Sequence, residues 1–253
     1  SSNDKKTALS RFERYNTRLK KVNELKDGIW GVKARNKEQM FALDLLMDPA
    51  IQVVSLIGKA GSGKTLIAIA AGLEQVLLNK NIKEKIKNNK NFGSSYKRLV
   101  VSRPVMPMGR DIGFLPGTMQ EKMAPWLAPV QDNLKFLTGD DQVTLDDYME
   151  RGLIEIEALT YIRGRSIANA YIVVDEAQNL TPHEIKTILT RVGEGTKIVL
   201  TGDIEQIDNI YINEMSSGLT HAVEKMKNYG LSGHITLKKG ERSQVASLAA
   251  KIL

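Results

Sequence analysis

Residues 58–65 read "GKAGSGKT" and lie between the apolar run "IQVVSLI" (51–57) and the helix-like stretch "LIAIAAGLEQVL" (66–77). The stretch matches the phosphate-binding pattern G-x-x-x-x-G-K-[ST]. It also stands in the context that this pattern requires, with a strand before it and a helix after it. We therefore expect the loop to hold the phosphates of a nucleotide.

The residue types in this loop each serve the binding of phosphate. Glycines at 58, 61 and 63 let backbone N–H groups converge on the phosphates, and Lys64 reaches the β- and γ-phosphate oxygens. The Thr65 hydroxyl is a ligand for Mg²⁺ at the N-terminus of the following helix. The predicted nucleotide-binding residues of the loop are Gly58, Lys59, Ala60, Gly61, Ser62, Gly63, Lys64 and Thr65.

A second part of the site is predicted at "YIVVDEAQ" (171–178). Four apolar residues form a buried strand that delivers Asp175 to its carboxyl end, where ligands bind in open α/β sheets. Asp175 is then a second Mg²⁺ ligand, and Glu176 is placed to act as general base on the attacking water. This pair favours hydrolysis over the transfer to an acceptor that small-molecule kinases perform. The guanine-reading pattern Asn-Lys-x-Asp is absent from the chain, which argues against GTP.

A third strand ends in "TGDIEQID" (201–208) and brings Thr201, Asp203 and Gln206 to the same edge of the sheet. The Gln206 amide can both donate and accept hydrogen bonds. It therefore suits a sensor of the γ-phosphate that changes partners on hydrolysis. The alternative is that Gln206 is an ordinary loop amide.

Short β-rich runs alternate with helical patterns along the chain, which predicts a mostly parallel sheet with helices on both faces. The expected strands are 51–58, 98–104, 153–159, 171–177, 197–203 and 234–240. The expected helices are 64–78, 118–137, 141–151, 182–192, 214–228 and 241–252. Pro125 and Pro129 are expected to break the second of these helices. In "TPHE", Thr181 and Glu184 predict a capping box with Pro182 at the first helical position.

Composition sets the outer limits on function. The 253 residues are 42% hydrophobic and 26% charged, which suits one α/β domain with appendages. Without cysteines the chain has neither disulfides nor thiolate zinc sites, and its three histidines lack metal-ligand spacing. No apolar run approaches the ~20 residues of a membrane helix and no signal-peptide pattern is present, so we expect a cytoplasmic location.

The formal net charge of +7 is concentrated near the N-terminus. Residues 1–40 hold eleven Lys or Arg and five Asp or Glu, and so supply +6 of it. Such a balance favours a polyanion partner such as nucleic acid, although a solvated basic face is equally consistent with it. Residues 1–28 are expected to form a basic, weakly helical lead-in. The chain does not begin with Met, and a domain upstream of it is left open.

Six motifs in this order, "GKAGSGKT", "VSRPVMPMGRDIGFLPG", "IRGRS", "VVDEAQNLTPHE", "TGDIEQID" and "KGERS", resemble those of the PhoH-like ATPases. The likeness is greatest to the ATPase half of the PIN–PhoH proteins and runs from about Trp30 to the end. It implies a RecA-like α/β P-loop core related to superfamily 1 helicases, with ATP and Mg²⁺ as cofactors and RNA as partner. Residues 1–29 are then a lead-in or linker and residues 30–253 the ATPase domain. The PIN ribonuclease domain of that arrangement would have to lie upstream, because residues 1–29 have no room for it.

The resemblance also assigns roles near the nucleotide. "NKEQMFAL" is similar to the glutamine motif upstream of the P-loop, so Gln39 is expected to read the adenine edge unless it is a helix-surface residue. "KGERS" is similar to a late arginine motif and nominates Arg242 as the γ-phosphate finger unless it is a surface arginine. One RecA-like core leaves the site open, so either Arg242 closes it in cis or a neighbouring subunit does. The second case implies a homo-oligomeric ring, a hexamer by family resemblance.

Four further arginines are carried over as RNA contacts. Arg103 and Arg110 follow the strand where related helicases touch the nucleic-acid backbone, although such an arginine can instead pair with a core carboxylate. Arg163 and Arg165 flank a glycine turn and are expected to contact RNA or a neighbour's nucleotide. The favoured function is an ATPase that couples hydrolysis to binding, translocation or unwinding of single-stranded RNA. The alternative is an ATP-dependent switch or scaffold. The 6% aromatic content mildly favours this alternative, or RNA binding through the backbone only, because stacking platforms need aromatics.

Overall fold

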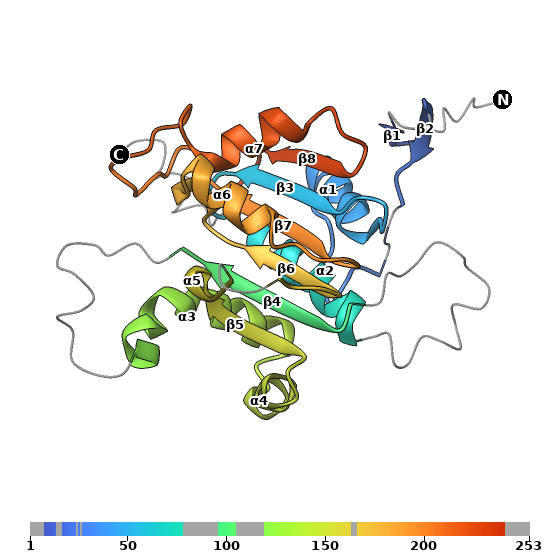
Figure 1. The fold of residues 1–253 in the computed structure, drawn as a ribbon. Coiled ribbons are helices and arrows are strands. Elements are labelled where there is room, and N and C mark those ends of the chain that lie inside the picture. The colour runs from blue at the N-terminus through green and yellow to red at the C-terminus, as the bar shows by residue number, and fades with distance from the viewer. Residues whose placement is uncertain are drawn as a thin grey trace, which may run out of the picture.

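The computed structural model describes residues 8–13, 17–23, 25, 27–77, 96–104, 119–162 and 166–240. Within them, a parallel sheet of six strands forms the centre of the molecule, in the order β5-β4-β6-β7-β3-β8 (Figure 1). The strands are β3 (Val53–Gly58), β4 (Arg98–Arg103), β5 (Ile154–Ala158), β6 (Ala170–Val174), β7 (Lys197–Gly202) and β8 (Ser232–Leu237). All six predicted strands are confirmed, with ends that differ by a few residues.

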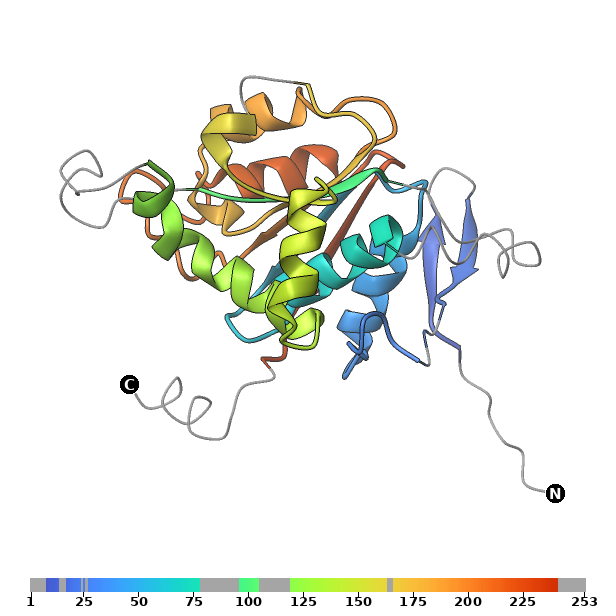
Figure 2. The same ribbon diagram turned by 90° about the horizontal axis from the view of Figure 1, so that it is seen from below.

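Helices cover both faces of this sheet (Figure 2). They are α1 (Lys37–Met47), α2 (Lys64–Leu77), α3 (Met119–Leu137), α4 (Gln142–Glu150), α5 (Leu159–Ile162), α6 (Pro182–Leu189) and α7 (Gly218–Met226), with a 3₁₀ turn η4 (Ala177–Asn179). Alternate strand residues point to opposite faces, so Tyr171 and Val173 pack under α1 to α4 while Ile172 and Val174 pack under α5 to α7.

The strand order explains where the site lies. Strand β7 lies between the P-loop strand β3 and the acidic strand β6. The three motif-bearing strands are parallel, so their carboxyl ends lie side by side. This is a RecA-like α/β P-loop NTPase fold. The predicted capping box is also confirmed: Thr181 caps α6, and Glu184 bonds back to the Thr181 backbone.

Two predictions about elements are wrong. Helix α3 runs through Pro125 and Pro129 without a break. Each proline removes one backbone N–H, but buried Val130 and Leu134 anchor the helix to the core. The predicted helix 214–228 begins only at Gly218, and the predicted helix 241–252 lies outside the described residues.

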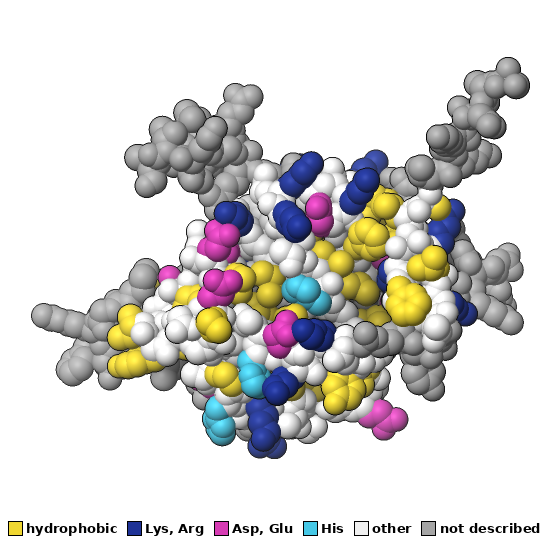
Figure 3. All heavy atoms as spheres, turned by 90° about the horizontal axis from the view of Figure 1, so that it is seen from above, with side chains coloured by type: hydrophobic (Ala, Val, Ile, Leu, Met, Phe, Trp, Pro, Cys, Tyr) yellow, Lys and Arg dark blue, Asp and Glu magenta, His cyan; other side chains and the backbone are white. Residues whose placement is uncertain are grey.

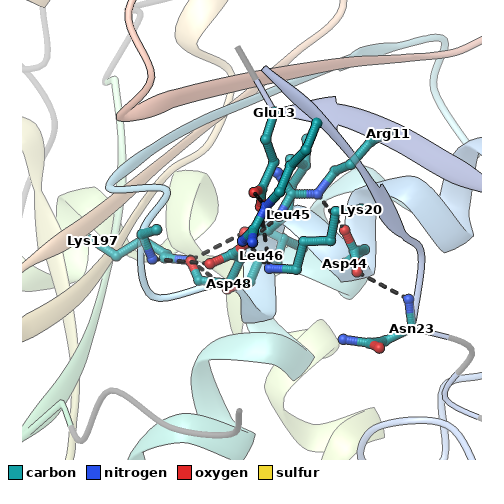
Figure 4. A network of polar contacts seen from close by, with 11 residues as sticks. Arg11, Glu13, Lys20, Asn23, Asp44, Leu45, Leu46, Asp48 and Lys197 are labelled. Atoms are coloured by element: carbon teal, nitrogen blue, oxygen red, sulfur yellow. Dashed lines mark hydrogen bonds and ion pairs between the residues drawn. The ribbon is translucent and has the colours of Figure 1, made fainter. Parts of the chain in front are cut away.

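The second error concerns the lead-in, which is not helical where the structure describes it. β1 (Ser10–Glu13) and β2 (Arg18–Lys21) form an antiparallel hairpin beside α1. Arg11 Nε donates to Asp44 (2.6 Å), and Lys20 Nζ donates to Asp48 (2.7 Å), which Arg11 also contacts (Figure 4). These side chains pair with residues far away in sequence, so local helical propensity did not predict the hairpin.

A buried lysine closes the same end of α1 from the other side. The ammonium of Lys197, on β7, donates to the carbonyls of Leu45 (3.2 Å), Leu46 (2.6 Å) and Asp48 (2.8 Å) (Figure 4). It thereby adds a charged donor to carbonyls at the helix end, which also accept from the Gln75 amide and from the backbone N–H groups of Asp48 and Ile51. Burial lowers the pKa of Lys197 to about 7.

In the part of the chain that the structure describes, no helix is long and apolar enough to cross a membrane.

Candidate nucleotide site

The P-loop has the geometry that its sequence predicts. β3 ends at Gly58 and α2 begins at Lys64, so the loop opens on a helix N-terminus, where backbone N–H groups and the helix dipole favour anions. Gly61 and Gly63 have φ angles of 79° and 81°, which side-chain-bearing residues rarely adopt. A Cβ at Gly58 would lie 2.8 Å from the Leu237 carbonyl oxygen, so the loop is also packed too closely there for a side chain.

Ser62 packs inside the loop. Its side chain is fully buried, its Oγ lies next to Gly58, and this Oγ has no hydrogen-bond partner among the described residues. Lys64, at the first position of α2, is buried as well. The helix N-terminus and the two left-handed glycines are the features of this loop that fit a phosphate group.

Asp175 joins the three strands into one site. It follows β6 and is buried, and its Oδ1 accepts hydrogen bonds from the Thr65 hydroxyl (2.7 Å) and the Thr201 hydroxyl (2.6 Å). Thr65 comes from the first turn of α2 and Thr201 from β7. Carboxylate and hydroxyl oxygens are hard ligands of the kind that Mg²⁺ prefers, and Mg²⁺ usually adds substrate phosphate oxygens to one or two carboxylates. The predicted pair Thr65 and Asp175 is thus brought together, and its chemistry fits Mg²⁺.

Glu176 lies next to this pair in an unusual backbone conformation. Its φ of 53° is left-handed, which turns the chain sharply from β6 into η4. A residue other than glycine in this region costs of order 1–3 kcal/mol, and such residues concentrate at functional sites. Arg103 at the end of β4 lies 3.4 Å from Glu176 Oε1, and the Gln178 amide donates to Oε2 (2.5 Å). The carboxylate is thus held from two sides.

Gln178 is a site residue that sequence reasoning missed. Its fully buried side chain donates to Glu176 and to the carbonyl of Gln206 (2.9 Å), and accepts from the backbone N–H of Asp203 (3.1 Å). It therefore links the predicted base to the loop after β7. The sequence signal was its place in "DEAQ", but the 3₁₀ turn that brings the amide back toward Glu176 could not be predicted.

The P-loop is tied to the loop after β7 as well. The backbone N–H of Ala60 donates to Asp203 Oδ2 (2.8 Å), and Lys59 Nζ lies 2.8 Å from Glu205. Gln206 sits at this edge as predicted and is exposed, but the contacts found for it are made by its backbone. Its role as a sensor stays a prediction.

Gln39 contacts the backbone of the P-loop. It lies in the first turn of α1 and is buried, so the alternative of a helix-surface glutamine is wrong. Its amide donates to the carbonyl of Ser62 (3.0 Å) and accepts from the backbone N–H of Arg35 (2.8 Å). It also borders a pocket of about 220 Å³ whose lining includes Val32, Leu66, Ile67 and Phe136. The pocket is also lined by Lys33 and Arg35, so it is only partly apolar. The role of Gln39 in reading adenine stays a prediction.

Of the five arginines predicted to have functional roles, the structure describes one, Arg103. Arg103 is found on Glu176, which is the carboxylate pairing considered as its alternative. Its contact with RNA stays a prediction. Arg110, Arg163, Arg165 and Arg242 lie outside the described residues.

Comparison with curated proteins finds relatives along nearly the whole chain. It is 48% identical to Protein PhoH2 of Bacillus subtilis over 98% of this chain and 53% of that protein. It is 39% identical to Protein PhoH2 of Mycolicibacterium smegmatis over 89% of this chain and 48% of that protein. A PhoH-like protein of B. subtilis is 38% identical over 78% of this chain and 56% of its own length. The chain spans about half the length of the curated relatives it matches.

Solved structures give only weaker likenesses. Pif1 helicase from Candida albicans matches with a TM-score of 0.37 and 15% identity over 87% of this chain and 43% of that chain. Bacteroides Pif1 bound to single-stranded DNA matches with a TM-score of 0.34 and 13% identity over 86% of this chain and 45% of that chain. Both are too weak to bear on the function of this chain.

A family model described as PhoH-like protein matches residues 31–252, which takes in the P-loop, the acidic strand and the loop after β7. The chain belongs to the family of PhoH-like proteins.

Proposed function

We propose that the chain is a Mg²⁺-dependent ATP hydrolase. The observation that carries this proposal is the set of hydrogen bonds between Thr65, Asp175 and Thr201, because they bring a P-loop hydroxyl and a buried carboxylate together at one point. The pocket beside Gln39, together with the absence of a guanine-reading motif, favours adenine.

In this proposal the chain's own groups have distinct tasks. Lys64 and the P-loop backbone bind and orient the phosphates, and bound Mg²⁺ would supply charge neutralisation at them. Glu176 accepts the proton of the attacking water as general base. Arg103 and Gln178 act through Glu176, because they fix the direction of its carboxylate.

The test uses Lys64→Ala and Glu176→Gln. Lys64→Ala is expected to lose tight ATP binding because it removes a contact to the β- and γ-phosphates. Glu176→Gln is expected to keep ATP affinity and to hydrolyse roughly 10²–10⁴-fold more slowly, the usual contribution of a general base. Glu150→Gln, an exposed carboxylate on α4, is the matched control and should behave as the parent. ATP affinity by calorimetry and phosphate release measure both effects.

Two outcomes contradict the assignments separately. Parent-like ATP affinity in Lys64→Ala would remove the P-loop as the binding site. A rate in Glu176→Gln within a few-fold of the parent would remove Glu176 as the base.

We further propose that hydrolysis is coupled to single-stranded RNA. The excess of basic residues and the resemblance of the "VSRP" and "IRGRS" motifs support this, and an ATP-dependent switch or scaffold is the alternative. An ATPase rate that rises with single-stranded RNA, and rises less at higher salt, supports coupling, because phosphate contacts weaken with salt. A rate unchanged by RNA at both salt concentrations favours the switch.

The larger assembly is also a proposal. We infer that the complete protein has a PIN nuclease domain upstream, acts in the cytoplasm, and assembles into a homo-oligomeric ring, with a hexamer suggested by family resemblance. The support for assembly is that the described residues form one RecA-like core, which does not by itself cover the nucleotide site.

A further inference from the structure

Phe136 is a large apolar side chain exposed at the end of a well-anchored helix. It lies in the last turn of α3 and is 63% exposed, whereas Leu134 and Leu137 in the same turn are buried. The helix end is also closed, because the backbone N–H groups of Thr138 and Gly139 donate to the carbonyls of Leu134 (2.9 Å) and Phe136 (3.2 Å). Phe136 is therefore held facing away from the core.

A single exposed phenylalanine means little by itself, because isolated apolar residues are common on protein surfaces. Phe136, however, borders the pocket of about 220 Å³ beside Gln39. Gly61 and Gly63 of the P-loop line the same pocket. Helices α2 and α3 pack against each other, so the end of α3 lies beside the loop that is proposed to bind phosphate.

Backbone hydrogen bonds hold the other walls of this pocket. Ile29 and Val32 exchange two of them (2.9 Å each), and Val32 contributes to the lining. The Gln39 side chain is fixed by the carbonyl of Ser62 and the N–H of Arg35. The pocket therefore exists before a ligand arrives, and binding need not order it first.

The size and lining of the pocket suit one part of a nucleotide. Sites that enclose a whole drug-sized ligand usually measure about 300–1,000 Å³, so a pocket of about 220 Å³ suits a single ring system. Leu66 and Ile67 add apolar contact to the wall that Phe136 forms. Lys33 and Arg35 also line the pocket, and neither has a carboxylate partner among the described residues. Their charge favours a ligand that carries phosphate as well as a ring.

A larger hollow of about 790 Å³ lies beside the hairpin, but it does not suit the same nucleotide. Figure 3 shows hydrophobic side chains beside Lys and Arg side chains at this end of the molecule. The lining includes Ile51, before β3, and Ser232, at the start of β8, so the hollow lies at the edge of the sheet opposite the P-loop. Each of its four Lys and Arg side chains is ion-paired within the chain: Arg11, Arg18, Lys20 and Lys227.

We propose that Phe136 stacks on the base of the nucleotide whose phosphates bind in the P-loop. The proposal rests on the nucleotide site proposed above and adds to it the side chain that holds the base. Every base has a π-face, so stacking adds affinity without selecting adenine, and selection falls to polar groups of the pocket such as Gln39. The base is remote from the bond that breaks, so Phe136 binds the substrate and the transition state equally.

The test compares a ligand that has a base with one that lacks it. Phe136→Ala should weaken the binding of ADP roughly 5–100-fold, the effect expected from the loss of one base–aromatic stack. Its affinity for pyrophosphate, which has phosphates and no base, should equal that of the parent. Phe136→Tyr keeps an aromatic ring and should bind ADP as the parent does. Calorimetric titration in the presence of Mg²⁺ measures all these affinities.

A surface control and a kinetic measurement complete the test. Val143 is an apolar residue on α4 that is 79% exposed, and Val143→Ala should leave ADP affinity unchanged. In assays of phosphate release, Phe136→Ala should raise the KM for ATP and leave kcat near that of the parent, because it removes binding that is uniform along the reaction.

Three results would overturn the stacking and leave ATP hydrolysis standing. These are an ADP affinity in Phe136→Ala equal to that of the parent, a Phe136→Tyr variant as weak as Phe136→Ala, or an equal loss of affinity for ADP and pyrophosphate in Phe136→Ala. The last would show that the substitution disturbs the P-loop. A parent that binds neither ligand would overturn the nucleotide site, and the stacking with it.

Discussion

At the scale of single residues, Glu176 depends on neighbours that no local pattern connects to it. Arg103 comes from β4 and Gln178 from the 3₁₀ turn, and both hold the carboxylate. The meeting of Thr65 and Asp175 was predictable, because a motif specifies which atoms converge. The positions of Arg103 and Gln178 depend on rotamers and on a left-handed turn, which a motif does not specify.

Arg103 gives a prediction at this scale. Arg103→Ala is expected to lower ATP hydrolysis without RNA, with ATP affinity little changed, because it frees the Glu176 carboxylate to rotate. Arg98→Ala removes an arginine from the other end of the same strand, where it pairs with Glu155 (3.1 Å), and should leave the rate unchanged. Equal rates in Arg103→Ala and the parent, with weakened RNA affinity, would instead support the original prediction of an RNA contact.

At the scale of elements, α1 lies between the hairpin and the P-loop. Its last turn and the residue after it provide Asp44 and Asp48 to the hairpin, and its first turn provides Gln39 to the Ser62 carbonyl. The six core strands were predictable because buried parallel strands are continuous apolar runs. The hairpin was not, because its strands are short, highly charged and held by ion pairs to α1.

Asp48 tests how the hairpin is held. Asp48→Asn keeps the shape of the side chain but removes the charge that Arg11 and Lys20 share, so the free energy of unfolding should fall by about 2 kcal/mol. Hydrogen exchange of the hairpin amides should also become faster. Asp147→Asn, in an exposed pair with Arg151, is the control and should cost less than about 1 kcal/mol. Unchanged exchange in the hairpin would show that packing alone holds it.

Lys197 gives a pH prediction for the same end of α1. Its pKa is about 7 in the folded protein against an ordinary 10.5, so between these values the unfolded chain binds one more proton. The free energy of unfolding should therefore gain up to about 1.4 kcal/mol per pH unit as pH rises above 7. Below pH 7 this contribution is flat. Lys197→Met should lack the extra slope in denaturant titrations from pH 7 to 9, and equal slopes in both proteins would contradict the shifted pKa.

At the scale of the whole molecule, one core presents a nucleotide site at the open edge of its sheet. If Arg242 completes that site in a neighbour, Arg242→Ala and Glu176→Gln are each nearly inactive alone, since an arginine finger contributes roughly 10³–10⁵ in rate. Mixing them under conditions that exchange subunits should restore activity, because some interfaces then join an intact Glu176 to an intact Arg242. Phosphate release from the mixture measures this. Hetero-oligomers with no recovered activity would show that Arg242 acts in cis or not at all.

Lys197, which donates to the end of α1, is synthesised long after that helix. Lys197 follows Asp48 by 149 residues, so at about 5–20 residues per second the ribosome delivers it on the order of ten seconds after the helix it completes. Until then the carbonyls at the end of α1 that accept from Lys197 have only the Gln75 amide and the backbone N–H groups of Asp48 and Ile51 as donors. Helix α1, which supports the P-loop through Gln39, therefore receives its last contacts only when β7 inserts beside β3. The nucleotide site is completed late in folding, although its P-loop is synthesised early.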